Sequence, residues 1–488
     1  MWLQFKRYYI LAPMYNTGVT PVPLELPLRP AEAAELAHLI FDQAERKSLT
    51  DEVRNRLAAR ARVLRLSTIT PYFGSLGRDP VHPSAYYLAV DGEHGVPHLL
   101  YIALANAPTS SIFHHPLLIG RMRRHHGPEF VINAMEFGPL DHENLEKFAA
   151  CIDSGFLPRP QGLRAAIAVR LGADKPAGHA AAAFEAFRAI LKRTGKNLAA
   201  VCAADCAADC RTVDSAAGAT ARDAYYAGLW AAIRAGWREE YSAGTEIAVE
   251  AESLDSASLD SASLDRAKES ILAAAGFTRF ATNTARLLRQ PASGAALQEQ
   301  FEAWFPAAER GWILDEFVRR FDIGGAVYEL TAGDVPRLAV KWSRCLKVNE
   351  HLHEYIRQTR GAQKVARTFD FEPVLGGPGL TTPLTTPQEL LFCLHWLKAR
   401  GHAAQMAAPN LGFVAGQPYL ADTAGELGQR VTELAAIARH YQAILSVRHG
   451  GGKQPEVIRA IAKATVGRVN YQTSDAAEIA FIAEELLG

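Results

Sequence analysis

The sequence predicts an α/β fold: a (β/α)8 barrel of the TIM type over residues 159–488, preceded by an α+β region over residues 1–158. Two observations lead to this prediction. From Gly162 onward, short apolar runs alternate with helical stretches eight times, which is the number of units that such a barrel needs. The chain has 488 residues, of which 49% are apolar, so it can bury a large core.

One unit of the alternation is clear in residues 369–411. Phe369–Leu375 is apolar and is followed by two glycines, and Thr386–Arg400 has the apolar spacing of a helix. Gly401 ends that helix before the next apolar run. Strand, loop, helix and strand therefore follow one another. In such units the groups that face a ligand lie at the C-terminal ends of the strands.

The whole barrel can be divided in the same way. The predicted strands are the eight apolar runs Ala165–Val169, Leu198–Cys202, Ile247–Ala251, Phe277–Ala281, Phe369–Leu375, Ala403–Ala408, Ala443–Val447 and Val469–Gln472. The predicted helices are Ala180–Lys192, Ala221–Trp237, Asp265–Ala274, Leu297–Phe305, Pro387–Arg400, Gly425–Tyr441, Gln454–Lys463 and Asp475–Leu487. An insertion at about 283–368 is predicted to be mostly helical, with one long helix at Val335–Thr359.

The N-terminal region has a different pattern. Its predicted elements are one long helix, three strands and a closing helix, at Ala31–Ala59, Ala85–Val90, His98–Leu104, Phe130–Ala134 and 141–151. The basic stretch between the second and third strands, Arg121–His126, could bind an anion, but a solvated charge run is the favoured interpretation. The closing helix is expected to contribute structure rather than chemistry, and the role of the region as a whole is not indicated.

Composition limits the function classes. The chain has 52 basic and 52 acidic residues, so its lack of net charge argues against a nucleic-acid or acidic-membrane partner and favours a small molecule. The N-terminal apolar run is too short for a secretory signal, and no stretch reaches membrane-spanning length, so we expect a cytoplasmic protein. Six cysteines in this length do not form a disulfide framework. The oligomeric state is not indicated.

Two repeats interrupt the alternation, CAADCAADC at 202–210 and SLDSASLDSASLD at 253–265. The four-residue spacing of Cys202, Cys206 and Cys210 would place three thiolates on one helix face, where they could hold a metal. The spacing lacks the C-x2-C form of usual zinc sites, so duplicated, mobile loops are the favoured interpretation of both repeats.

Three segments of the 369–411 stretch show a family resemblance: FDFE at 369–372, TTPQELLF at 385–392 and APNLGF at 408–413. They resemble the tagaturonate epimerase family, metal-dependent bacterial barrels that interconvert hexuronates. The resemblance extends from about residue 130 to the C-terminus. It implies a sugar acid as ligand and a divalent metal that stabilises the charge formed during epimerisation.

The family motifs at the first and third strands are partly kept. At the first strand Arg170 remains, where it would bind a substrate carboxylate or form a structural ion pair. At the third strand, the run TEIAVEAES places Glu250 and Glu252 at the positions of two family acids, and an ungapped alignment places Glu246 nearby instead. Glu250 and Glu252 are therefore the predicted acid/base pair, although both would also fit a frayed, solvated strand end.

The motifs at the other three strands are mostly replaced. Two glycines stand at the acidic pair after the fifth strand, and Arg448 stands at a family histidine after the seventh, with His449 one place away and Lys453 matched. At the eighth strand, Asn470 and Gln472 take the places of two ionisable residues. Gly450–Gly452 could form an anion-binding nest with Lys453.

These replacements leave three functions open. In the first, the chain binds a sugar acid through Arg170, Arg448, Lys453, Asn470 and Gln472 and has lost metal-dependent epimerisation. In the second, it is an active epimerase or isomerase that uses a rebuilt site of Glu250, Glu252 and His449. In the third, it is a non-catalytic scaffold or protein-binding barrel. The donor set predicts that a divalent metal is bound weakly or not at all.

Overall fold

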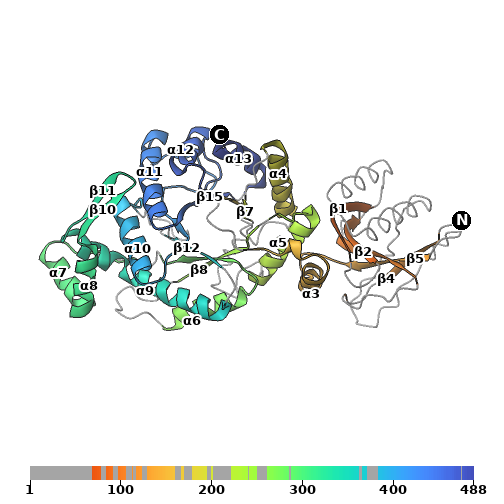
Figure 1. Ribbon diagram of the computed structural model, residues 1–488, viewed down its shortest axis with the longest axis horizontal. Helices are drawn as coiled ribbons and strands as arrows, with labels where there is room; N and C mark the ends of the chain where they lie inside the picture. Colours follow the sequence, from red (N-terminus) through yellow and green to blue (C-terminus); the bar gives the residue numbers. More distant parts are fainter. Residues whose placement is uncertain are drawn as a thin grey trace. The chain divides into compact units, whose positions relative to one another are not determined.

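The structure is a computed structural model of the chain, and its elements are labelled in Figure 1. It describes residues 69–78, 84–91, 97–105, 113, 117–123, 129–159, 166–169, 178–194, 199–201, 221–239, 241–249, 261–284, 287–361, 365–370, 383–473 and 475–487. The chain forms two compact units. The first is Met1–Leu157 with Tyr226–Glu239, and the second is Pro158–Tyr225 with Glu240–Gly488.

The first unit contains an antiparallel sheet of five strands in the order β1-β2-β3-β5-β4. The strands are β1 (Ile69–Arg78), β2 (Ser84–Asp91), β3 (Pro97–Leu104), β4 (Leu117–Arg123) and β5 (Glu129–Glu136). The three predicted strands are confirmed. Arg121 and Arg123 lie on β4, which pairs with β5, and the interpretation of the basic stretch as a solvated charge run stays a prediction. The predicted helix at 31–59 lies outside the described residues.

Short helices follow this sheet: α3 (His142–Lys147), a π-helical turn (Phe148–Ile152) and a 3-10 turn (Ser154–Phe156). The later part of α5 (Ala221–Ala235) belongs to the same unit. Trp230 of α5 donates a hydrogen bond to the carbonyl of Phe137 at 3.0 Å. After the helix, Arg238 pairs with Asp153 at 2.7 Å and donates to the carbonyl of Gly74 at 2.6 Å. These contacts join segments that are distant in the sequence.

The second unit is built on eight parallel strands in the order β7-β6-β15-β14-β13-β12-β9-β8. In chain order they are β6 (Ala166–Val169), β7 (Ala199–Val201), β8 (Gly244–Ala248), β9 (Arg279–Asn283), β12 (Ala366–Asp370), β13 (Met406–Ala408), β14 (Ile444–Val447) and β15 (Val469–Thr473). The first strand of the series, β6, pairs with the last, β15. The order of the strands in the sheet is therefore a cyclic permutation of their order in the chain, and β7 and β8 are the two end strands of the sheet order.

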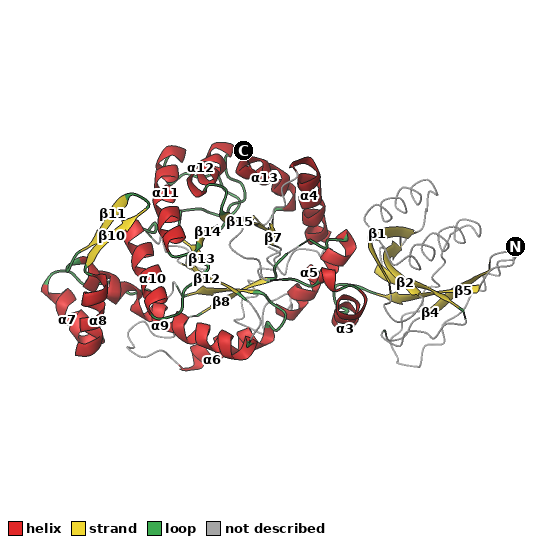
Figure 2. Cartoon of the chain, in the orientation of Figure 1, coloured by secondary structure: helices red, strands yellow, loops and turns green. Residues whose placement is uncertain are grey.

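Helices lie around the outside of these strands (Figure 2). They are α4 (Gly178–Thr194), α6 (Ser261–Ala273), α9 (Asp334–Arg360), α10 (Pro387–Ala399), α11 (Ala424–His440), α12 (Pro455–Thr465) and α13 (Ile479–Leu487), and a 3-10 turn, Ala476–Glu478, precedes α13. The predicted alternation of strands and helices is confirmed. The third strand begins three residues earlier than predicted, at Gly244 rather than Ile247.

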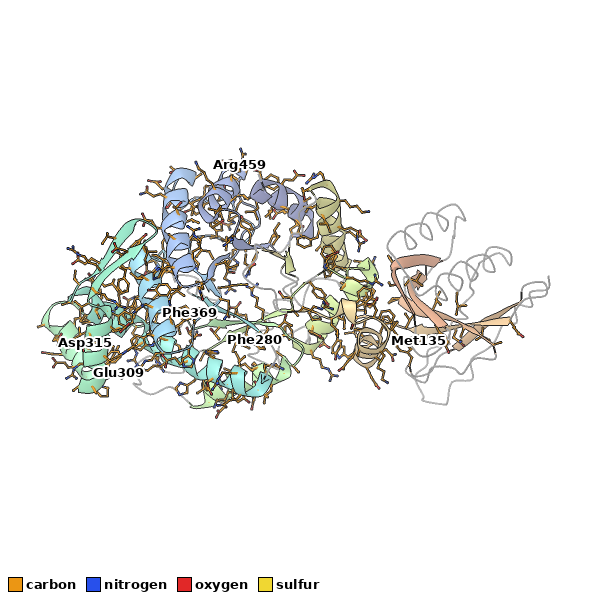
Figure 3. All side chains as sticks on the ribbon, viewed as in Figure 1. Met135, Phe280, Glu309, Asp315, Phe369 and Arg459 are labelled. Atoms are coloured by element: carbon orange, nitrogen blue, oxygen red, sulfur yellow. The ribbon has the colours of Figure 1, made fainter. Side chains whose placement is uncertain are left out.

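The long helix α9 covers the outer face of β9 and β12. Phe280 of β9 and Phe369 of β12, labelled in Figure 3, are completely buried. The ring of Trp342 packs against Phe369 with centroids 6.3 Å apart, and Asn349 donates to the hydroxyl of Thr282 at 2.7 Å. The predicted long helix at 335–359 is thus confirmed, and its buried face rests on the sheet.

The insertion between β9 and β12 is not only helical, which corrects the prediction. Besides α7 (Ala295–Trp304) and α8 (Ala307–Phe317), it contains an antiparallel hairpin of β10 (Arg319–Ile323) and β11 (Ala326–Leu330). Gly324 and Gly325, both at positive φ, make its two-residue turn. Both strands bury alternate residues, as expected for a hairpin with one covered face.

Within the described part of the chain, none of the helices combines the length and the apolar character that a membrane crossing requires.

Candidate functional site

A buried ion pair crosses the interior of the eight-stranded sheet. Arg448, directly after β14, pairs through one guanidinium nitrogen with Glu246 of β8. Each of the two residues is 6% exposed. Asn283, at the end of β9, donates from its amide to the other carboxylate oxygen of Glu246 at 2.9 Å. The charged groups are therefore removed from water and hydrogen-bonded together.

This ion pair also reports on the shape of the sheet. Three strands separate β8 from β14 in the sheet order. Neighbouring strands lie about 4.8 Å apart, so a flat sheet would hold β8 and β14 about 19 Å from each other. A guanidinium and a carboxylate can meet across that gap only if the sheet curves strongly around its interior.

Strand alternation explains which residues point inward. Ser446 of β14 lies two residues before Arg448 and therefore faces the same side. The hydroxyl of Ser446 accepts a hydrogen bond from Gln472 of β15 at 3.1 Å. On β15, Asn470 is two residues before Gln472, is completely buried and donates to the sulfur of Met406 at 3.5 Å. The predicted residues Arg448, Asn470 and Gln472 thus share the interior with Glu246 and Asn283.

The three remaining residues at the first and third strands cannot be placed. Arg170, Glu250 and Glu252 lie outside the described residues, as do Gly376, Gly377 and the cysteines of the first repeat. Their predicted roles stay predictions. Glu246, which the ungapped alignment named and the sequence interpretation did not select, is the acidic residue of β8 that the structure brings to Arg448.

His449 follows Arg448 but has left the strand. Its φ is +53°, in the left-handed region, and β14 ends at Val447. The side chain is half-buried. Arg448, the residue before it, contacts the acidic residue of β8. A catalytic role for His449 stays a prediction.

Lys453 uses its ammonium to hold loops of the protein. It donates to the carbonyls of Val414 at 2.8 Å, Gln417 at 2.6 Å and Gly451 at 2.8 Å, so each of its three N–H groups has a carbonyl acceptor. Burial lowers the pKa of Lys453 to about 8, and the nearby carboxylate of Glu478 opposes that shift. In this arrangement the ammonium joins the loops after β13 and β14 instead of presenting a donor to a ligand.

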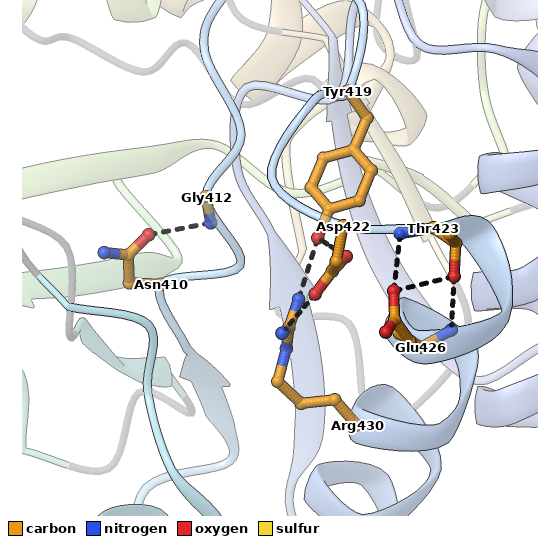
Figure 4. Close-up of polar contacts among 7 residues, drawn as sticks. All are labelled: Asn410, Gly412, Tyr419, Asp422, Thr423, Glu426 and Arg430. Atoms are coloured by element: carbon orange, nitrogen blue, oxygen red, sulfur yellow. Dashed lines mark hydrogen bonds and ion pairs between the residues drawn. The ribbon is translucent and has the colours of Figure 1, made fainter.

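The loop after β13 has its own polar support, shown in Figure 4. Asn410, from the APNLGF segment, accepts from the backbone N–H of Gly412 at 2.9 Å. Further along, Arg430 donates to Asp422 at 2.6 Å and to the hydroxyl of Tyr419 at 2.8 Å. These contacts keep the loop ordered next to the C-terminal ends of β13 and β14.

The described interior does not suit a divalent metal. Among the residues that the structure describes, no group of three or more His, Cys, Asp or Glu side chains lies close enough together to hold one. Arg448 also places a cation beside the acidic group of Glu246, whose other carboxylate oxygen accepts from the amide of Asn283.

The fold and the interior define an α/β protein of eight parallel strands in cyclic order, with a polar centre at their C-terminal ends. Solved structures with this fold include the fructuronate-tagaturonate epimerase UxaE from Cohnella laeviribosi. Its complex with two glycerols is similar to 85% of this chain over 75% of its own, with a TM-score of 0.63 and 16% identity. The native enzyme gives a TM-score of 0.62 and 17% identity over 85% and 74% of the two chains. The resemblance to tagaturonate epimerases is thus confirmed at the level of the fold.

No protein-family model matches the chain, and no curated protein matches it.

Proposed function

We propose that the eight strands close into a (β/α)8 barrel by pairing of β7 with β8. The cyclic strand order supports this closure, since β7 and β8 are the second and third strands in the chain and stand at the two ends of the order. The ion pair between Glu246 and Arg448 supports it as well, because the third and seventh strands face each other across the interior of a closed barrel.

We further propose that the barrel binds a sugar acid at the C-terminal ends of its strands and does not catalyse metal-dependent epimerisation. The observation that carries this proposal is the buried guanidinium of Arg448, whose partner Glu246 also accepts a hydrogen bond from the amide of Asn283. A guanidinium binds a carboxylate bidentately, and amides can hydrogen-bond to hydroxyl groups. The fold likeness to an enzyme named for fructuronate and tagaturonate suggests hexuronates as the ligand class.

In this proposal the ligand carboxylate competes with Glu246 for Arg448. The guanidinium has five N–H donors, and one of its terminal nitrogens is engaged with Glu246. A ligand carboxylate would replace or share that contact, so that no charge remains buried without an opposite charge. Asn283 would keep its hydrogen bond to Glu246 while the acid is bound.

The absence of epimerisation follows from the same residues. Epimerisation needs a group to remove a proton, a group to return it and an electrophile for the oxyanion. Near neutral pH a guanidinium and carboxamides cannot exchange protons with a sugar carbon, and the carboxylate of Glu246 is held by Arg448 and Asn283. Catalytic groups that act together also do not fail additively, so replacing several leaves little more than binding.

The binding test uses calorimetry with fructuronate and tagaturonate. Arg448→Lys keeps the charge but loses the bidentate geometry, so we expect its affinity to fall about tenfold, which is about 1.4 kcal/mol. Arg459→Lys, an exposed arginine on α12, is the matched control and should bind as the parent chain does. Equal affinity of the parent chain and Arg448→Lys would rule out the proposed contact.

The activity test adds Mn²⁺, Ni²⁺ or Zn²⁺ to each hexuronate and follows product formation and solvent deuterium exchange. We expect neither. Turnover that is abolished by Glu250→Gln or His449→Ala would instead establish the active epimerase, and loss of affinity in Arg170→Ala would add that residue to the binding site. Failure to bind any hexuronate would favour the non-catalytic scaffold.

A further inference from the structure

The loops after β14 and β15 enclose a carboxylate that belongs to the chain itself. The backbone N–H of Gly452 points at both carboxylate oxygens of Glu478, at 3.0 Å and 3.2 Å. The hydroxyl of Thr473 donates to one of them at 3.1 Å. Burial lowers the pKa of the Lys453 ammonium, and the negative charge of Glu478 acts in the opposite direction and raises it. We call Gly451, Gly452, Lys453 and Thr473 the anion seat.

Two glycines allow this close approach. A Cβ on Gly451 would lie 3.0 Å from a carboxylate oxygen of Glu478 and 3.1 Å from the hydroxyl of Thr473. Gly452 adopts φ +74°, and a Cβ there would lie 2.8 Å from the backbone of Gly416. Any larger residue would therefore have to displace the carboxylate or the neighbouring loop.

The donors of the seat are those that proteins use for oxyanions. A backbone N–H in a glycine-rich turn and a hydroxyl donate directly to the negative group, and the ammonium of Lys453, whose N–H groups are held by carbonyls, adds only its charge. In (β/α)8 barrels, the loops after the seventh and eighth strands frequently bind phosphate. β14 and β15 are the seventh and eighth parallel strands of this unit, and they pair directly.

We propose that Glu478 is an internal anion that fills an oxyanion seat, and that removing its carboxylate opens this seat to inorganic phosphate or sulfate. In the parent chain the seat then rejects a phosphorylated ligand, because a second anion beside the carboxylate would meet repulsion and steric overlap. Glu478 is thus the residue that restricts ligands to unphosphorylated acids. This statement about ligands rests on the proposed function, but the existence of the seat does not.

The experiment compares thermal unfolding of the parent chain, Glu478→Ala and Glu478→Gln in phosphate, in sulfate and in chloride of equal ionic strength. Glu484→Ala, on the helix α13 that follows the 3-10 turn of Glu478, removes an exposed carboxylate and is the matched control. We expect the Tm of Glu478→Ala to rise by about 2 °C when phosphate reaches about ten times its Kd, with saturation. The other three proteins should show no such rise, because in Glu478→Gln the amide still fills the seat. Phosphorus NMR should show line broadening only with Glu478→Ala.

Three outcomes would overturn the proposal. The first is a folded Glu478→Ala that responds to phosphate no more than Glu484→Ala does. The second is a parent chain that gains the same stability from phosphate. The third is that neither Glu478→Ala nor Glu478→Ser folds in phosphate or in chloride, since an oxyanion that substitutes for the carboxylate should permit folding in phosphate. None of these measurements uses a hexuronate. A negative result would therefore rule out the anion seat without bearing on hexuronate binding.

Discussion

At the scale of single residues, substitutions in the buried ion pair of Glu246 and Arg448 are expected to have a large effect on the free energy of unfolding. Removing one member of a buried ion pair leaves the other in a poorly solvated place, at a cost of about 3–5 kcal/mol. We therefore expect Arg448→Met to lower the free energy of unfolding by about that amount. Combining it with Glu246→Met should recover part of the loss, because no charge is then buried. Urea unfolding of the two single variants and the double variant measures this coupling.

Arg193→Met provides the comparison. Arg193 pairs with Glu484 on the surface, where both side chains are about half-exposed, and such pairs contribute less than about 1 kcal/mol. If the Arg448 variant were as mildly destabilised as the Arg193 variant, the interior pair would be solvated and its proposed part in ligand binding would lose its basis.

The sequence predicts Arg448 as a site residue but not its partner Glu246. Arg448 is identified because it stands where a resembling motif has a histidine, and Asn470 and Gln472 because they stand at two ionisable residues of the eighth-strand motif. Glu246 is 202 residues from Arg448, and no local pattern relates the two positions. The apolar run at 247–251 also shifts the expected strand three residues onward, which directs attention to Glu250 and Glu252 instead.

At the scale of elements, two helices begin with the same capping box but use it differently. In α10 the side chains of Thr386 and Glu389 cap each other's backbone N–H groups, and in α11 Thr423 and Glu426 do the same (Figure 4). Glu389 is 7% exposed and also pairs with Lys341 of α9, whereas Glu426 is exposed. The box of α10 therefore also joins two helices.

This difference predicts unequal costs for the same substitution. Glu426→Ala should lower the free energy of unfolding by no more than about 1 kcal/mol, the usual worth of a cap. Glu389→Ala should cost about 2–3 kcal/mol, because it also removes the charged partner of Lys341. Chemical unfolding of both variants measures the two changes in the free energy of unfolding. Lys341→Met should reproduce part of the larger loss, and equal costs at the two boxes would contradict the joining role.

The elements themselves are largely predictable, and the exception has a physical cause. Helices such as α10 carry start signals, a Thr cap with Pro at the first position, that do not depend on distant contacts. The hairpin of β10 and β11 also carries a local signal, two glycines between alternating runs, but it is short and lies between strongly helical segments. The prediction that the insertion is mostly helical therefore misses this hairpin.

At the scale of the whole molecule, closure of the barrel has a direct consequence for hydrogen exchange. In a parallel strand successive backbone amides point to opposite neighbours, so a strand at an open edge leaves about half of them unpaired. If β7 and β8 pair, all amides of Gly244–Ala248 should exchange slowly. Exchange measured by residue-resolved NMR checks this, with β12, which has partners on both sides, as the internal reference. Fast exchange of alternate residues in β8 would indicate an open sheet.

The alternation of strands and helices makes the parallel sheet predictable, because each unit carries its own apolar pattern and stop signals. The contacts that curve the sheet join residues that are distant in the sequence. The sequence could therefore predict which residues lie at the strand ends, but not which of them contact one another. The expected division of the chain near residue 158 stays a prediction about domains. In the structure, the first compact unit also includes Tyr226–Glu239.

Lys453 carries one more consequence. Three backbone carbonyls around a compact monovalent cation form the kind of surrounding in which other proteins keep a potassium or ammonium ion. Here the cation is covalently attached to the chain, so its local concentration is set by a side chain and not by the medium. The loops after β13 and β14 should therefore keep their arrangement when sodium replaces potassium, and dialysis cannot remove what holds them together.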